Sequence, residues 1–160
     1  MYPRNVYYEN QHIKNRINSG ENVVDLAKTS PLVTSLIDVI NLLDIVPTVY
    51  HLGFGLGYYF KAIKELRPEL KLYGCEFDPM FLNFGQGLFQ VNDNVESVNI
   101  FHSMENWNVN TFCDIVLVED WFFSLDRDLK KKVFEKAIAT CKKCVIFEKL
   151  DEDFDFNEKD

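Results

Sequence analysis

Short apolar runs alternate with amphipathic stretches along most of the chain. Five short apolar runs predict strands, the third being the weakest: 48–52, 70–77, 97–102, 113–118 and 144–147. Continuous apolar strands separated by helices are typical of a parallel sheet covered on both faces. With right-handed crossovers, the pattern predicts an α/β fold with a doubly wound, mostly parallel five-stranded sheet and helices on both faces.

The segments between these runs have helical spacing. Apolar residues at positions 59, 60, 63 and 66 predict one helix, which ends at Arg67-Pro68. Asp78 and Pro79 predict the cap and first residue of a second, extending to about Phe89. Ser124 or Asp126 can cap a third helix. Its apolar face would contain Leu129, Val133, Ala137, Ile138 and Cys141, and its solvated face Lys130, Lys131, Lys132 and Lys136.

The first 47 residues predict a helical N-terminal segment. Its clearest helix starts at Ser30-Pro31 and is nearly apolar on two faces, so we expect it beneath the sheet or against a partner. The chain has no internal repeat and no Gly/Ser linker. We therefore expect a single domain over 1–160, with a helical segment at 1–47, a core at 48–150 and an acidic tail at 151–160.

Composition narrows the class of protein. The 160 residues are 47% hydrophobic, which suffices for one sizeable core, and no run of 18 apolar residues predicts a membrane helix. The N-terminus lacks the apolar region of a signal peptide, so we expect a cytoplasmic protein. Of the net charge of −8, residues 151–160 carry −5. This balance lacks the basic footprint of nucleic-acid binding and favours a small molecule or protein as partner.

The pair Cys141 and Cys144 has the C-x-x-C spacing of zinc and redox sites. A structural zinc site needs two further ligands, and no second pair with suitable spacing follows. A redox pair would open a helix, whereas this one falls where a helix is predicted to end. We therefore interpret both cysteines as structural and predict no metal.

Glycines and an acid mark the most informative segment. Gly53, Gly55 and Gly57 follow the first predicted strand and precede a helix, where glycine lets the backbone turn sharply beside a ligand. Glu76 ends the second strand, 23 residues after Gly53. In doubly wound folds this position faces the ligand crevice, and its carboxylate can accept both ribose hydroxyls. Because Asp78 can cap the next helix, Glu76 is available for a nucleoside.

The spacing of the glycines narrows the choice of nucleoside cofactor. A dinucleotide fingerprint would place its last small residue at Tyr58, and no P-loop motif occurs. The runs His51–Gly57 and Gly74–Pro79 instead resemble motifs I and II of class I S-adenosylmethionine-dependent methyltransferases, which are Rossmann-like. Residues 113–120 resemble the family's fourth strand. The resemblance covers residues 48–150 and makes this a compact member.

The resemblance implies the residues of a cofactor site for S-adenosylmethionine. The three glycines, with His51 and Phe54 in the same run, would line the methionine part, and Glu76 would hold the ribose. Phe77, Ser103 and Met104 would lie near the adenine. Glu119 and Asp120 match the place where cofactor and substrate meet. Asp120 is the candidate catalytic base, with Glu119 as the alternative, for an acceptor that must lose a proton.

Three features depart from the family. His51 stands where the family usually has an acid, and Ser103 stands where it often has Asp. The usual C-terminal β-hairpin would be missing or reduced to residues 151–160. The expected result is an open sheet edge, which favours a homo- or hetero-oligomer.

Other readings of the site stay open. The signature [DNS]-P-P-[YF] of amino-methyltransferases is absent, and the acceptor is unidentified. Trp121, Phe122 and Phe123 would either stack on a flat substrate or belong to the core. Tyr7, Tyr8 and His12 would close over the pocket.

Three alternative functions remain. The chain could be a non-catalytic cofactor-binding or scaffold subunit that docks on a partner. It could use S-adenosylmethionine for aminopropyl transfer or cofactor breakdown. A dehydrogenase fragment is disfavoured by Tyr58 and by the short length.

Overall fold

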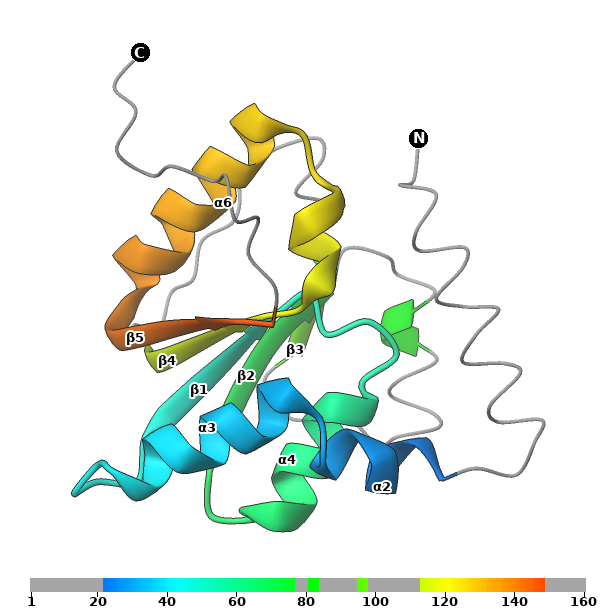
Figure 1. Ribbon diagram of the computed structural model, residues 1–160, viewed down its shortest axis with the longest axis vertical. Helices are drawn as coiled ribbons and strands as arrows, with labels where there is room; N and C mark the ends of the chain where they lie inside the picture. Colours follow the sequence, from blue (N-terminus) through cyan, green and yellow to red (C-terminus); the bar gives the residue numbers. More distant parts are fainter. Residues whose placement is uncertain (1–21, 77–80, 84–94, 98–112, 149–160) are drawn as a thin grey trace.

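A five-stranded parallel sheet forms the centre of the protein in the computed structural model (Figure 1). The structure describes residues 22–76, 81–83, 95–97 and 113–148. The strand order is β3-β2-β1-β4-β5, and every neighbouring pair is parallel. The strands are β1 (Thr48–Leu52), β2 (Lys71–Glu76), the short edge strand β3 (Val95–Ser97), β4 (Cys113–Val118) and β5 (Cys141–Phe147).

The predicted α/β fold is confirmed by this sheet and its order. The chain adds strands outward from β1 to β3 and then crosses to the other side of β1 to form β4 and β5. The point where the order reverses therefore lies between β1 and β4. In open parallel sheets a ligand crevice lies outside the carboxyl ends of the strands at such a point.

Helices cover both faces of the sheet, as predicted (Figure 1). On one face lie α2 (Val23–Lys28), α3 (Pro31–Asn41) and α4 (Tyr58–Leu66). On the other lie the short 3₁₀ helix η2 (Asp120–Ser124) and α6 (Arg127–Thr140). Helix α3 begins where Ser30-Pro31 predicted, with the Ser30 hydroxyl accepting a hydrogen bond from the Val33 amide at 3.3 Å.

Two apolar cores separate along the two faces of the sheet. The strands alternate in the direction of their side chains, so that Val49 packs with α3 and α4, and Tyr50 packs with η2 and α6. Leu32, Val33, Leu36 and Ile40 of α3 are all buried in the first core. The prediction that this helix lies beneath the sheet is therefore confirmed.

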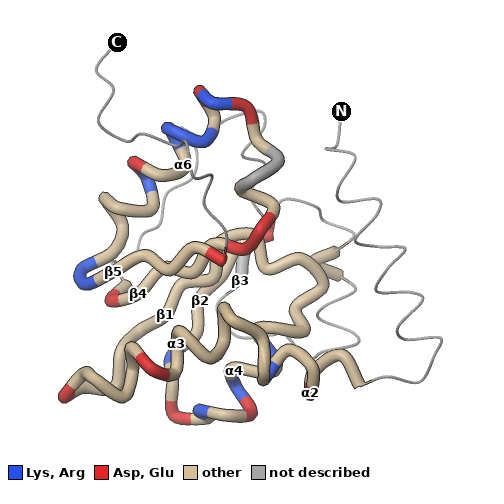
Figure 2. The backbone as a smooth tube through the Cα atoms, in the orientation of Figure 1, with Lys and Arg blue, Asp and Glu red and all other residues tan. Residues whose placement is uncertain are grey.

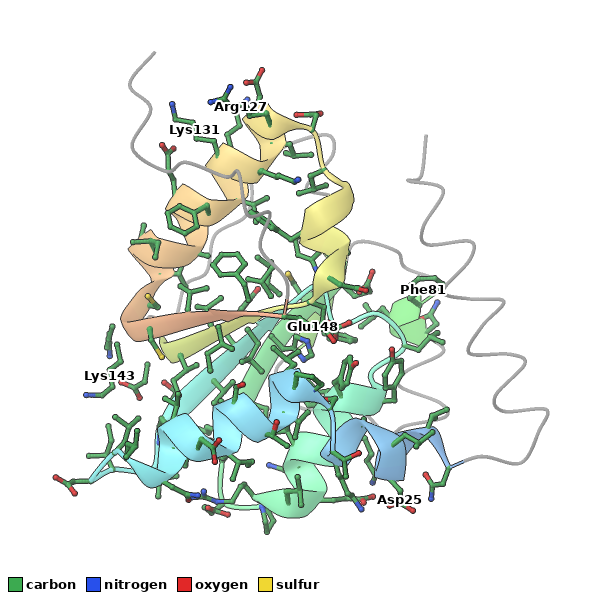
Figure 3. The ribbon with its side chains drawn as sticks, in the orientation of Figure 1. Asp25, Phe81, Arg127, Lys131, Lys143 and Glu148 are labelled. Atoms are coloured by element: carbon green, nitrogen blue, oxygen red, sulfur yellow. The ribbon has the colours of Figure 1, made fainter. Side chains whose placement is uncertain are left out.

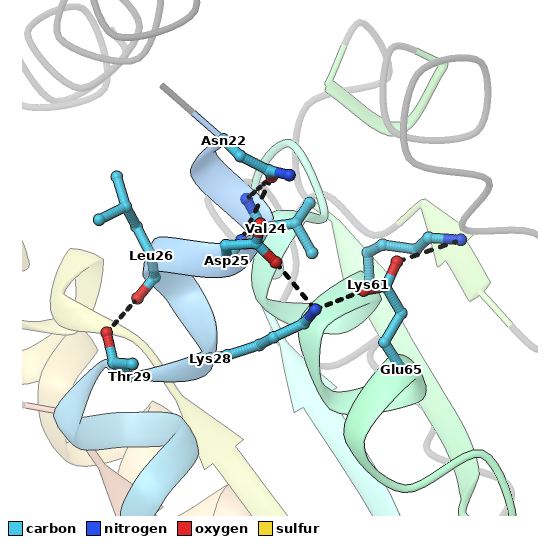
Figure 4. A network of polar contacts seen from close by, with 8 residues as sticks. All are labelled: Asn22, Val24, Asp25, Leu26, Lys28, Thr29, Lys61 and Glu65. Carbon is cyan, nitrogen blue, oxygen red and sulfur yellow. Dashed lines mark hydrogen bonds and ion pairs between the residues drawn. The ribbon is translucent and has the colours of Figure 1, made fainter. Parts of the chain in front are cut away.

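Charged contacts join α2 to α4 at the surface of the first layer (Figure 4). Asn22 caps α2 by accepting hydrogen bonds from the amides of Val24 and Asp25 at 3.1 and 3.2 Å. The Lys28 ammonium lies 2.9 Å from Asp25 and 2.7 Å from Glu65 of α4. The sequence analysis did not identify α2, which has only six residues and depends on this packing.

The buried face of α6 differs from the prediction. Lys130, expected on the solvated face, is buried, whereas Ile138 is 47% exposed. The buried positions are 130, 133, 137 and 140, which form one stripe at helical spacing, and Ile138 lies beside that stripe. Asp126, rather than Ser124, caps the helix and accepts a hydrogen bond from the Leu129 amide at 2.9 Å.

The ends of several strands and helices also differ from the predicted ends. Strand β5 begins at Cys141, three residues earlier than predicted, so Cys141 belongs to the sheet and not to the helix. The third strand was expected over 97–102, and its described part is 95–97. Of the helix expected from Pro79 to Phe89, residues 81–83 are helical and the others lie outside the described residues. None of the described helices combines the length and apolar character that a membrane crossing requires.

Candidate functional site

The three glycines after β1 form the turn that the sequence predicted. Gly53, Gly55 and Gly57 have φ angles of 67°, 57° and 87°, in the left-handed region that other residues rarely adopt. The amides of Gly53 and Phe54 donate to the Cys75 carbonyl at 2.9 and 3.3 Å, which ties the turn to the end of β2. Gly57 is the N-cap of α4 and provides no side-chain cap, so the first amides of the helix lack a side-chain partner at this end.

Glu76 fixes the middle of this turn. Its carboxylate accepts a hydrogen bond from the Gly55 amide at 2.6 Å, and the residue is buried at 4% exposure. A Cβ at Gly55 would have no atom within 4 Å, so the space above the turn is open. The arrangement is a cradle of backbone beside a carboxylate, which suits a polar ligand that approaches closely. The assignment of Glu76 to a ribose stays a prediction.

Phe54 and Gly74 lock the turn onto the sheet. The Phe54 ring is buried in the first core, so only the backbone of this predicted site residue can face the crevice. A Cβ at Gly74 would lie 2.9 Å from Cδ1 of Phe54 and 3.0 Å from the His51 carbonyl oxygen. Position 74 therefore needs glycine because of the ring above it, a requirement that the sequence alone did not reveal.

His51 and Glu119 meet between β1 and β4. The His51 Nε2 atom lies 2.7 Å from Oε1 of Glu119, and both side chains are almost fully buried. Neither ring nitrogen makes a hydrogen bond of acceptable geometry, and Nδ1 has no partner. Burial lowers the pKa of His51 to about 3, so the imidazole is neutral at pH 7. The residue that stands where the resembled family usually has an acid therefore carries no charge at pH 7.

A third carboxylate, Glu148, follows β5 and was not identified from the sequence. It accepts hydrogen bonds from the Tyr59 hydroxyl at 3.2 Å and from the Asp120 amide at 3.1 Å. Figure 3 shows Glu148 where the sheet ends, and Figure 2 shows acidic positions gathered there. Burial, followed by the charges of Glu119 and Glu148, raises the pKa of Tyr59 far above its ordinary value. Tyr59 is therefore a permanent hydrogen-bond donor.

A simple signal could have found Glu148. An acid is the last residue of β2 and directly follows β4 and β5, at Glu76, Glu119 and Glu148. The first two were singled out because motifs surround them, and the third has no such motif. Parallel strands end at one edge of the sheet, so the rule that selects Glu76 selects all three.

In the aromatic run after β4, the two residues with described side chains, Trp121 and Phe122, have structural roles. Phe122 is buried in the second core, which excludes it as a stacking surface for a substrate. The Trp121 indole donates to the Leu52 carbonyl at 3.1 Å and thereby joins η2 to the end of β1. Asp120 is half-buried at the start of η2, and its role as a base stays a prediction.

Several predicted residues lie outside the described residues. These are the adenine-side residues Phe77, Ser103 and Met104, the cap Asp78, and the N-terminal Tyr7, Tyr8 and His12. The tail at 151–160, with its expected hairpin remnant, lies outside them as well. Their predicted roles stay predictions.

The cysteine pair on β5 is structural within the described sheet. Cys141 packs in the core on the α6 face, and Cys144 packs in the core on the α3 face. Side chains on opposite faces of a strand do not form a joint redox or metal site. Among the residues that the structure describes, no group of three His, Cys, Asp or Glu side chains is arranged to hold a metal ion.

Solved structures resemble this fold. An S-adenosylmethionine-dependent methyltransferase from Clostridium acetobutylicum superposes with a TM-score of 0.61 at 18% identity, over 88% of this chain and 56% of its own. The plantazolicin methyltransferase BpumL, solved with S-adenosylhomocysteine, superposes at 0.62 with 13% identity, over 83% and 48%. The methyltransferase domain of bacterial CtHen1-C does so at 0.58 with 12% identity, over 71% and 62%.

The chain has the fold of an S-adenosylmethionine-dependent methyltransferase. It spans about half to three fifths of the length of these three structures. No protein-family model and no curated protein matches its sequence. At these identities the similarity concerns the arrangement of the chain, so function has to be argued from the site.

Proposed function

We propose that this protein binds S-adenosylmethionine at the carboxyl edge of its sheet and transfers the methyl group to an acceptor. The observation that carries the proposal is the Glu76 carboxylate, held 2.6 Å from the Gly55 amide at the tip of β2. This arrangement provides a buried acceptor for ribose hydroxyls. Beside it, the glycine turn has a left-handed backbone, over which a ligand can approach the main chain closely. Comparable structures with S-adenosylhomocysteine bound support the choice of cofactor.

The described residues fit this cofactor on two independent counts. The space over Gly55 is open where a side chain would otherwise project, and both ring nitrogens of His51, at the end of the strand before the turn, are buried without a well-formed hydrogen bond. Gly53, Gly55 and Gly57 would line the methionine part and Glu76 would hold the ribose. When bound, the cofactor supplies an electrophilic methyl group on a sulfonium. The protein contributes orientation and a site from which water is excluded.

Asp120 is the proposed base for an acceptor that must lose a proton. It is half-buried at the end of β4, and Glu148 holds its backbone amide. Glu119, the alternative, is 4% exposed and lies against His51, which makes it less accessible to an acceptor. Three carboxylates near this end of the sheet disfavour a phosphate-rich acceptor, so we propose a small molecule or a protein.

The first test is titration calorimetry with S-adenosylmethionine and S-adenosylhomocysteine on the protein and on Glu76→Gln. Glutamine keeps an oxygen for the Gly55 amide but loses the charge. We therefore expect at least tenfold weaker binding of both ligands with an unchanged fold. The matched control is Asp38→Asn, which removes an exposed carboxylate on α3 and should leave the affinity unchanged. No binding by the folded protein would overturn the proposal.

A second candidate is cofactor binding without methyl transfer, as a subunit that docks on a partner. The neutral, buried His51 favours it, because the site carries no fixed charge at this position. The two candidates differ in their products. Transfer of labelled methyl from S-adenosylmethionine to any acceptor supports the enzyme, and loss of other cofactor fragments indicates aminopropyl transfer or breakdown. A cytoplasmic location and assembly through the sheet edge stay predictions.

A further inference from the structure

Exposed apolar side chains gather at the end of the protein where the strands begin (Figure 1). In the described ranges, six large hydrophobic residues are exposed, and five of them lie within six residues before the start of a strand. These five are Leu42, Ile45 and Val46 before β1, Leu66 before β2 and Ile138 before β5. Parallel strands begin at one edge of the sheet, so this amino edge is opposite the proposed cofactor site.

The loop between α3 and β1 contains the most exposed of these side chains. Leu42 is 83% exposed, Val46 59% and Ile45 49%. Single exposed apolar residues are ordinary on protein surfaces, whereas a cluster of them indicates a surface that another molecule covers. The three residues lie within five positions of the chain and therefore form such a cluster.

Hydrogen bonds anchor both ends of this loop. The Arg67 guanidinium, directly after α4, donates to the Asn41 side chain at the end of α3 at 3.3 Å. At the other end, the Thr48 amide donates to the Asp114 carboxylate of β4 at 2.9 Å, and the Asp114 amide donates to the Thr48 hydroxyl at 3.0 Å. The loop is therefore held in place at the edge, which lowers the ordering cost of docking.

Charges of both signs border the loop. Asp44 is exposed within it, and Lys142 and Lys143, the lysine pair, are exposed at the start of β5. Val49 of β1 and Cys144 of β5 align with the same residue of β4, so the lysine pair lies at the same edge as the loop. Figure 3 shows Lys143 at this end of the sheet, and Figure 2 shows both signs of charge there.

We propose that this surface binds a second copy of the chain across a two-fold axis. In such a pair, the loop of one copy packs on the loop of the other, and Asp44 of each copy faces the lysine pair of the other. A surface with both signs of charge around an apolar centre is complementary to itself. The inference does not depend on the proposed function, because the contact leaves the carboxyl edge of both copies accessible.

The lateral edge of the sheet at β5 is less suitable for this contact. The lysine pair occupies its first half, and the register with β4 is irregular between Cys141 and Cys144. Charged side chains and bulges are features by which natural sheets oppose pairing with another strand. We therefore place the contact at the amino ends of the strands and not along β5.

Sedimentation velocity of the full chain tests the apolar part of the contact. We expect a dimer at about 50 µM, and association at least about 100-fold weaker for Leu42→Lys with Val46→Lys, because each lysine would be buried in the contact. Leu26→Lys is the matched control, since it makes the same change at an exposed leucine on α2, and it should leave the dimer intact. Circular dichroism checks the fold of each variant.

A mixing experiment separates a contact between copies from a structural role within one chain. Asp44→Lys places like charges opposite each other in both halves of the dimer, and so does Lys142→Glu with Lys143→Glu. Each variant alone should associate about tenfold more weakly. An equimolar mixture of the two should recover the affinity of the wild-type protein, because opposite charges then face each other in both halves.

Three results would overturn the proposal. A wild-type chain that stays a monomer at about 50 µM would leave this edge to a different protein. A dimer that Leu26→Lys weakens as much as the loop variant does would not involve the loop. A mixture that associates no better than the two charge variants alone would show that Asp44 does not face the lysine pair of another copy.

Discussion

The two ends of the crevice are built in different ways. Between β1 and β2, the site consists of one continuous turn and the tip of the next strand, with Gly55 bonded to Glu76. Between β1 and β4, four separate elements contribute His51, Glu119, Glu148 and Tyr59. The first end depends on backbone conformation, and the second depends on buried polar side chains. Substitutions should therefore disturb the first end through sterics and the second through protonation and hydrogen bonding.

The largest expected effect is steric and concerns the first end. Gly74→Ala should lower the free energy of unfolding by about 2 kcal/mol, because the new Cβ would meet the Phe54 ring and the His51 carbonyl. An alanine in a strand without such contacts would usually raise stability. Urea denaturation measures the change. In a Phe54→Leu background the cost should shrink, since the branched side chain can rotate away; an equal cost there would show that the ring is not responsible.

The next effect concerns protonation at the second end. The folded pKa of His51, lowered by burial to about 3, lies below the ordinary 6.5, so only the unfolded state takes up this proton as the pH falls below 6.5. The contribution of His51 to the free energy of unfolding is fully present above pH 6.5. It falls by about 1 kcal/mol per pH unit as the pH is lowered towards 3.

Urea denaturation at pH 7.5 and 5.5 gives the free energy of unfolding of the wild-type protein and of His51→Gln, which has no titrating ring. The wild-type protein should lose about 1 kcal/mol more than the variant. The subtraction removes contributions that both proteins share, including those of the carboxylates. A wild-type protein that gains stability relative to the variant at pH 5.5 would instead mean a charged His51 paired with Glu119.

The smallest effect concerns the hydrogen bond that joins α4 to the end of β5. Tyr59→Phe removes the donor to Glu148 and should lower the free energy of unfolding by about 1 kcal/mol. Tyr73→Phe, which removes the hydroxyl of a half-buried tyrosine on β2, is the matched control. Thermal denaturation compares the two variants. An effect of Tyr59→Phe no larger than that of the control would show that this hydrogen bond adds nothing to stability.

Local patterns were sufficient for the first end of the crevice. Apolar runs bounded by turns located β1, β2 and β4 within one residue at each end, and the spacing of glycines between a strand and a helix located the turn. These features depend on neighbours in the sequence: a left-handed backbone requires glycine wherever it occurs, and an acid after a strand lies at the strand's tip. Helix α3 was located in the same way, from Ser30 and Pro31.

Only the tertiary structure decided the rest. The burial of Lys130 depends on which stripe of α6 meets the sheet, and the need for glycine at position 74 depends on the Phe54 ring above it. Glu148 reaches Tyr59, 89 positions away along the chain, because β5 ends and α4 begins at the same edge of the sheet. The amino-acid sequence alone thus determined the bounds of β1, β2 and β4, the turn and the acid at its side. The meeting of His51 with Glu119 required the sheet order, because residues from distant strands become neighbours only when the strands pair.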